Sequence, residues 1–265
     1  MKLKAFATTG LFRPPWPVVA IVIGLAASGA DARELYLIDA HSQIDHFVDR
    51  ATIVPLMDEA GIRHVILSTR GKVKPGQITA FAARHPDRIT ASVRTKGNPY
   101  ANDSKKYYKL LKKQLAMPGF GAMAEVIMWH AQKGNKAPEV VVAPDDKRVQ
   151  AALKGAIGKG WPFIIHIEFA ASQSAGTFMQ KMEAMLEAHP DHPFALIHMG
   201  QLEADEATRL LAKHSNFHFM TSHANPIMAI KSSQPWVDLF DGGEVLAPRW
   251  RVLFVKYPDR FILNF

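Results

Sequence analysis

The chain has 265 residues, of which 48% are hydrophobic and 21% charged; its formal net charge is +8, and it has no cysteine. This balance excludes a disordered chain and allows one large α/β domain. The lack of cysteine excludes a disulfide framework and a thiolate zinc site. The densest basic patch lies between Lys105 and Lys113, where leucines interleave at helical spacing, so it indicates a solvated helix face rather than a nucleic-acid site.

The N-terminus has the three parts of a secretory signal peptide. Basic residues come first, an apolar run covers 17–27, and Ala30-Asp31-Ala32 forms an Ala-x-Ala cleavage site. The apolar run is shorter than the roughly 20 residues of a spanning helix, although an uncleaved anchor is the alternative. We therefore predict a signal peptide over 1–32 and one mature domain over 33–265. The mature protein is expected to be exported, periplasmic or secreted, without stable membrane insertion.

Strand-like and helix-like stretches then alternate along the chain. The predicted strands are 35–41, 64–68, 89–93, 119–126, 163–167, 194–198, 217–221 and 260–265. The predicted helices are 47–61, 77–85, 103–116, 145–159, 178–189, 203–214 and 249–256, and a long irregular segment runs from 222 to 248. This order implies right-handed parallel crossovers, and no Gly-rich phosphate loop follows the first strand. The sequence thus predicts an α/β fold, a closed (β/α)8 TIM barrel.

Four predicted strands carry a ligand-type residue at the C-terminal end. His41, His166 and His198 each follow an apolar run, and Glu125 ends the fourth strand. Burial of such a group without a partner costs a few kcal/mol, and strand C-termini form the functional face of a barrel. The pattern predicts that the four side chains converge on a metal or catalytic centre, with structural hydrogen bonding as the alternative.

These residues lie in motifs that resemble a known family. The motifs are Ile38–Gln43, Met123–Glu125, Ile165–His166 and Ile197–Gly200, supported by the helix-to-strand segments Ala83–Ile89 and Lys256–Phe261. Through them the mature chain resembles the amidohydrolase superfamily, in its amidohydrolase-related branch of metal-dependent barrel hydrolases and decarboxylases. The resemblance implies a site for one or two divalent metals, commonly Zn²⁺ with Mn²⁺ as the other option.

The resemblance also implies a role for each residue. His41 and His166 would be metal ligands, and Glu125 a ligand or bridge with a catalytic part. His198 would hold a second metal or polarise the substrate. Gln43 replaces the second histidine of the family's His-x-His motif, so it would be a weaker metal ligand or a hydrogen-bonding neighbour.

A second departure from the family pattern concerns the eighth strand. The family has an Asp at the tip of that strand, as metal ligand and general base. This chain ends at Phe265, where that Asp would be expected next. We therefore expect a barrel that is C-terminally incomplete, and weak or no hydrolysis, because a missing general base costs about 10²–10⁴-fold in rate.

Three functions follow as hypotheses. The leading one is a metal-dependent hydrolase of an amide, ester or lactone. The others are a non-oxidative decarboxylase of an aromatic or unsaturated acid and a degenerate, non-catalytic binding protein. We expect a small molecule as partner and no nucleic acid; a homo-oligomer stays open. Residues that would line the pocket, or else serve as plain loop or surface residues, are Arg94, Lys96, Trp129, His130, His223, Asn225 and Trp236.

Overall fold

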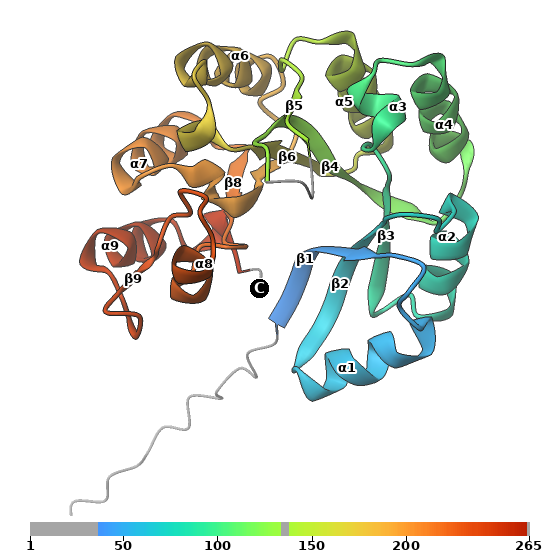
Figure 1. Cartoon of the computed structure of the whole chain (residues 1–265), viewed down its shortest axis with the longest axis horizontal. Coiled ribbons are helices and arrows are strands. Elements are labelled where there is room, and N and C mark those ends of the chain that lie inside the picture. The colour runs from blue at the N-terminus through green and yellow to red at the C-terminus, as the bar shows by residue number, and fades with distance from the viewer. Residues whose placement is uncertain (1–36, 134–137, 264–265) are drawn as a thin grey trace, which may run out of the picture. The chain divides into compact units, whose positions relative to one another are not determined.

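The computed structural model describes residues 37–133 and 138–263, so the predicted signal peptide lies outside the described residues. Eight parallel strands follow one another around a sheet, each paired with the next (Figure 1). They are β1 (Leu37–Ile44), β2 (Ile62–Thr69), β3 (Ile89–Val93), β4 (Phe120–His130), β6 (Phe163–Ile167), β7 (Phe194–Leu196), β8 (Phe217–Met220) and β11 (Phe261–Ile262). Among the described residues, β1 and β11 are the two ends of this order, so the barrel is nearly closed. The predicted TIM-barrel fold is confirmed.

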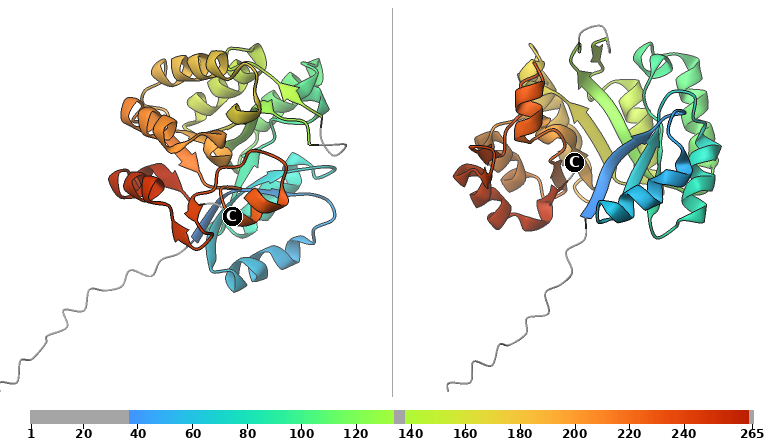
Figure 2. Two further views of the ribbon diagram at one scale, coloured as in Figure 1. Left: turned by 60° about the vertical axis from the view of Figure 1, so that its left-hand side comes forward. Right: turned by 60° about the horizontal axis from the view of Figure 1, so that its bottom comes forward.

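Helices connect the strands and surround them on the outside (Figures 1 and 2). They are α1 (Ile53–Glu59), α2 (Pro75–Arg84), α3 (Asn98–Ala101), α4 (Lys105–Ala116), α5 (Lys147–Lys159), α6 (Ala175–Glu187), α7 (Ala204–Lys213), α8 (Pro226–Lys231) and α9 (Pro248–Lys256). On α4, Tyr107 and Leu111 are buried while its lysines are exposed, as the leucine and lysine spacing predicts. No helix in the described part of the chain is long and apolar enough to cross a membrane.

Apolar side chains fill both faces of the sheet. Inside the barrel, six buried residues form one small cluster: Ala40, Ala124, Ile164, Ala195, Ile197 and Met220. The larger cluster lies between the strands and the helices, where Phe163, Phe194 and Phe217 are fully buried. Burial on both faces explains why the strands appear in the sequence as nearly continuous apolar runs.

Several segments differ from the sequence-based prediction. Strand β4 continues past the predicted end at 126 to His130, because its last two residues pair with β5 (Val140–Val141). Residues 222–248 are not wholly irregular, since they contain α8 and a hairpin of β9 (Phe240–Asp241) and β10 (Val245–Leu246). Helix α1 is shorter than predicted: a 3₁₀ turn over Arg50–Thr52, capped by the Asp49 side chain, precedes it.

The predicted sixth strand ends two residues early, at Leu196. The next residues, Ile197–Gln201, form a tight turn in which His198, Met199 and Gly200 have φ values of 56°, 53° and 62°. Such left-handed backbone costs energy at every residue except glycine. Burial of the whole turn holds it in place, so His198 is presented by a strained turn rather than by a strand.

Gly200→Ala is expected to destabilise the protein by about 2–4 kcal/mol. A Cβ at this position would lie 2.5 Å from Cδ2 of Leu196 and 3.3 Å from Cδ2 of Phe169. Urea unfolding measures the loss. Gly158→Ala on α5 is the matched control, because nothing lies within 4 Å of its Cβ and alanine favours a helix interior. Equal midpoints for the two variants would show that the turn adapts freely.

Candidate metal centre

The C-terminal ends of the strands open into a cavity of about 550 Å³. All five predicted ligands line it: His41 and Gln43 from β1, Glu125 from β4, His166 from β6, and His198 from the turn after β7. The right-hand view of Figure 2 shows α8 and the end of β4 at this same end of the barrel. The strand ends converge because the strands are parallel neighbours, as the sequence pattern predicts.

Glu125 is the most heavily contacted side chain of the cavity, and only 4% of it is exposed. Its Oε1 accepts a hydrogen bond from Nε2 of Gln43 at 2.9 Å and pairs with the ammonium of Lys96. Its Oε2 lies 2.9 Å from Nδ1 of His166 and 3.2 Å from Nε2 of His41. Burial alone would raise the pKa of Glu125, but the charges of Lys96 and His41 and the imidazole hydrogen bonds hold it well below its usual range. Glu125 is therefore an ionised carboxylate.

His41 pairs with Glu125, but its Nε2 lacks an aligned hydrogen bond among the described residues. This nitrogen is buried and lies 3.2 Å from Oε2 of Glu125. Buried polar atoms in proteins are nearly always satisfied by a hydrogen bond, a water or an ion. An imidazole nitrogen beside an ionised carboxylate is a donor set that suits a divalent metal.

His166 contacts a second carboxylate through its other nitrogen. Its Nε2 lies 3.0 Å from Oε1 of Glu168, a fully buried residue that also pairs with Lys133 at 2.8 Å. The backbone N–H of Ala131 donates to Oε2 of Glu168 at 2.8 Å. Burial raises the pKa of Glu168, but His166 and Lys133 outweigh it and lower the pKa to about 2. The sequence prediction missed Glu168, although its position two residues after His166 is a signal for the same strand face.

A metal-binding group forms on this side of His166. Ligand atoms of His130, His166 and Glu168 all lie within 4.8 Å of one another. Nδ1 of His130 is buried without a hydrogen-bond partner in the described chain, and burial lowers the pKa of this imidazole, which keeps it neutral. The imidazoles of His130 and His166 and the carboxylate of Glu168 are ligand types that zinc and related divalent metals prefer, once His166 has given up a proton. The residues thus fit a divalent metal, on a set that shares only His166 with the predicted ligands.

One other group in the described residues meets the same distance test: Glu183, Glu187 and His214. Glu183 already pairs with Arg209 at 2.8 Å and Lys213 at 2.7 Å. Because these cations already neutralise the carboxylate, we interpret the group as an ion-pair network between α6 and α7.

His198 lies against a second histidine. Its Nδ1 is 2.9 Å from Nδ1 of His223 and 3.1 Å from the carbonyl oxygen of Ser222. Burial first, and then the neighbouring imidazoles, hold the pKa of His198 well below its usual value, so it is neutral. The ring of Trp236 lies 5.1 Å from that of His198 and 4.9 Å from that of His223. His198 is therefore fixed as a neutral hydrogen-bonding group at the cavity.

The other pocket candidates divide. His130 and His223 line the cavity. Trp129 instead packs edge-on against Phe178 at 5.0 Å, and Asn225 caps α8 by accepting a hydrogen bond from the backbone N–H of Met228. Their side chains are used for packing and capping because β4 and α8 both extend through regions where the sequence prediction placed loops.

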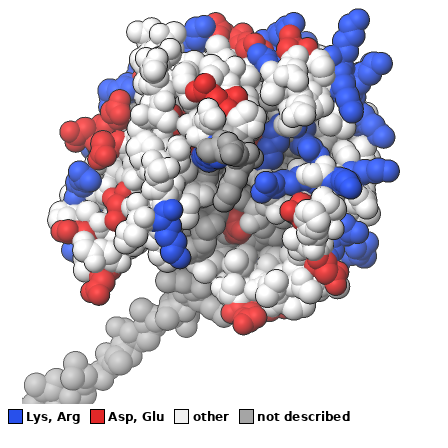
Figure 3. Space-filling model, viewed as in Figure 1, with Lys and Arg blue, Asp and Glu red and all other residues white. Residues whose placement is uncertain are grey.

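Four cationic side chains line the cavity: Arg70, Arg94, Lys96 and Lys133. Lys96 forms an ion pair with Glu125. Burial lowers the pKa of Lys96, although the charge of the Glu125 carboxylate acts to raise it. Arg94 is held by its backbone, which exchanges two hydrogen bonds with the buried amide of Gln114. Figure 3 shows Lys and Arg gathered on the side of the central hollow nearest α3 and α4. The cavity wall is therefore suited to an anionic group.

Fold and site together define a class: a TIM barrel with a His/Glu group able to hold a divalent metal at the C-terminal ends of its strands. Among solved structures, 2,6-dihydroxybenzoate decarboxylase with bound 2,6-dihydroxybenzoate has a similar fold, at 15% identity and a TM-score of 0.53 over 86% of each chain. The same enzyme from Rhizobium gives 15% and 0.52, also over 86% of each chain. A candidate amidohydrolase from Staphylococcus aureus gives 11% and 0.53 over 87% of each chain.

These likenesses concern the fold alone: the chain has the same barrel fold as these solved structures. No protein-family model matches the sequence, and the search of curated proteins finds no relative.

Proposed function

We propose that the chain is a metal-dependent hydrolase of the amidohydrolase type, acting on an amide, ester or lactone. The observation that carries the proposal is the group of His130, His166 and Glu168, whose ligand atoms lie within 4.8 Å at the end of the barrel where catalytic sites form. Zn²⁺ is the proposed metal, with Mn²⁺ as the alternative. A metal held there would supply an acidified water, with a pKa of about 7, and a Lewis acid for a carbonyl.

His166 offers two ways to hold that metal. Through Nε2 it would bind together with His130 and Glu168; through Nδ1 it would bind with His41 and Glu125, with Gln43 as a further oxygen donor. The carboxylate that the metal does not use would then orient the imidazole, as carboxylates commonly do beside metal-bound histidines.

Glu125 and His198 are proposed to position the ligands and to polarise the substrate. Glu125 stays ionised and fixes His41, His166 and Gln43 by direct contacts. His198, kept neutral by burial, is the proposed donor to an oxygen on which negative charge develops; in this role Nε2 carries the proton, and Nδ1 accepts from Oγ of Ser222, 2.9 Å away. In this proposal Glu125 is catalytic by orienting the imidazoles, because a carboxylate of such low pKa is a poor proton acceptor.

Turnover with added metal tests the proposal. The purified protein would be stripped with a chelator, reloaded with Zn²⁺ or Mn²⁺, and assayed on amides, esters and lactones. We expect weak hydrolysis in the reloaded samples and none in the stripped one. Hydrolysis that persists unchanged after stripping would contradict a metal-dependent mechanism.

Non-oxidative decarboxylation is the second candidate, and the cationic wall of the cavity favours it. A barrel of similar fold is a decarboxylase with an aromatic acid bound. We expect Arg94→Met to raise the KM for acid substrates about 10-fold or more, since a charged hydrogen bond contributes about 1.5–3 kcal/mol. Release of CO₂ from aromatic acids is the readout. Arg251→Met on the exposed face of α9 is the control, and equal KM values for both variants would argue against the role of Arg94.

We also propose export, on the pattern of residues 1–32. N-terminal sequencing of fractionated protein should give Arg33 as the first residue. An intact Met1 in the cytosolic fraction would disprove it.

A further inference from the structure

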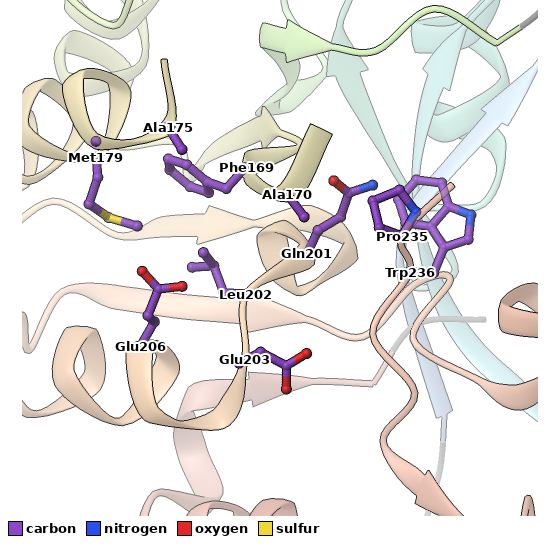
Figure 4. A pocket seen from close by; sticks show the side chains of 11 residues that line it. Phe169, Ala170, Ala175, Met179, Gln201, Leu202, Glu203, Glu206, Pro235 and Trp236 are labelled. Carbon is purple, nitrogen blue, oxygen red and sulfur yellow. The ribbon is translucent and has the colours of Figure 1, made fainter. Parts of the chain in front are cut away.

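A second pocket of about 550 Å³ opens beside the catalytic cavity, between the loops that follow β6, β7 and β8 (Figure 4). We call it the Gln201 pocket; its lining side chains used below are Phe169, Met179, Gln201, Leu202, Glu206 and Trp236. We propose that it binds a small organic cation: a primary ammonium compound with an apolar body and an amide group. This site goes beyond the proposed hydrolysis and does not depend on it.

The walls supply the apolar part of the argument. Phe169 and Leu202 are nearly fully buried, at 3% and 2% exposed, and Met179 is 9% exposed. Figure 4 shows Met179, Phe169 and Leu202 on one side of the pocket, and Pro235 and Trp236 on the other. A volume of this size, with mostly apolar walls and a few polar groups, is typical of small-molecule sites.

Gln201 supplies a polar group without a partner. It is 4% exposed, and neither its Nε2 nor its Oε1 makes a hydrogen bond within the described part of the chain. Its φ of 57° ends the left-handed turn that starts at His198, so the backbone holds the side chain at this position. Figure 4 shows the carboxamide next to Ala170 and Pro235. A buried amide is costly when unpaired, and the partner that satisfies both its donor and its acceptor is another amide.

The charge of the pocket comes from the start of α7. Glu203 and Glu206 line it, and Asp205 lies between them in the same helical turn. Arg249 reaches Glu203 at 3.5 Å, whereas the described residues give Glu206 no ion-pair partner. A helix N-terminus alone would favour an anion, but these carboxylates already supply that charge and leave the pocket negative. An ammonium group is the complement.

The Gln201 pocket is separate from the catalytic cavity, since the two have no lining residue in common. They also have opposite charge: Arg70, Arg94, Lys96 and Lys133 line one, and Glu203 and Glu206 line the other. Trp236 stands between them, since it lines the Gln201 pocket and its ring packs against His198 and His223. A ligand that enters one pocket should therefore not compete directly for the other.

Calorimetric titration with phenylalanine amide tests the proposal, because this probe carries an ammonium, an aromatic ring and a primary amide. We expect saturable binding in the full chain, and at least fivefold weaker binding of 3-phenylpropionate, which has the same ring but an anionic head. Glu206→Gln should weaken phenylalanine amide about three- to fivefold, the size of a solvent-exposed ion pair. Asp205→Asn, the matched control from the same turn but outside the lining, should change it less than twofold.

Gln201→Leu separates a binding role from a structural one. The leucine has similar size and removes the unpaired amide, so the variant should unfold at a higher temperature while binding phenylalanine amide about tenfold more weakly. Four results would each overturn the proposal. Two concern the variants: an unchanged affinity in Gln201→Leu, or equal effects of Glu206→Gln and Asp205→Asn. Two concern the ligands: equal binding of 3-phenylpropionate, or no saturable heat up to about 10 mM phenylalanine amide.

Discussion

Replacement of His166 by alanine is expected to abolish metal binding. This imidazole belongs to both candidate ligand sets, since Nδ1 faces Glu125 and Nε2 faces Glu168. Loss of a ligand common to both sets should lower the affinity for Zn²⁺ by at least about 100-fold, because even partners of metal ligands are each worth 10–100-fold. Equilibrium dialysis with metal analysis measures the change.

His192→Ala is the control for this experiment. His192 is also buried, but it lies two residues before β7 and outside the cavity lining. The metal affinity of this variant should therefore match that of the parent protein. The variants His41→Ala and His130→Ala then decide between the two ligand sets. Metal content should fall only in the variant that lacks a histidine of the set that binds the metal. Full metal content in His166→Ala would show that neither set is the metal centre.

Lys96→Met is expected to destabilise the metal-free protein by about 3 kcal/mol. The Lys96 side chain is 15% exposed and pairs with Glu125, whose side chain is 5% exposed, so the methionine leaves a buried carboxylate without its closest cation. Chemical unfolding near neutral pH measures the loss. The double variant Lys96→Met/Glu125→Gln should recover most of it, because the charge that needs a partner is then gone.

The pH dependence gives a second readout for Lys96. The pKa of Glu125 is depressed in the folded state, so its contribution is present above its unfolded value of 4.5 and is lost as pH falls through the folded pKa. In Lys96→Met the pKa of Glu125 should rise, and the loss of stability on the acid side should become smaller. Lys112→Met, on the exposed face of α4, should leave both the free energy of unfolding and its pH dependence unchanged. A Lys96→Met variant as stable as this control would exclude an important ion pair.

Local patterns predict most of the barrel. Runs such as Phe163–Ile167 are buried on both faces and bounded by Gly or Pro, so their length and composition mark them as strands without any knowledge of their neighbours. The same logic locates His41, Glu125 and His166, because a parallel sheet brings its strand ends to one face.

Other parts of the site depend on contacts that a linear pattern does not contain. The position of Lys96 after the third strand predicts a pocket-lining or surface residue, but it pairs with Glu125, 29 residues further along the chain. Glu168 joins the site together with Lys133, which lies beyond the predicted end of β4. The turn at His198 is stabilised by burial of the whole segment, whereas the local preference of Ile197 is for extended backbone.

The contacts around His166 form one continuous row of ionisable groups across the barrel mouth: Lys96, Glu125, His166, Glu168 and Lys133. Burial lowers the pKa of His166, but its two carboxylate partners outweigh burial and raise it above 6.5, so below that pH positive and negative charges alternate along the whole row. The protonated imidazole stabilises the fold below pH 6.5, and this contribution is lost as pH rises through the folded pKa. A divalent ion that binds either nitrogen of His166 must expel a proton. Metal loading is thus an exchange of a proton for a divalent cation within a row whose charges already alternate.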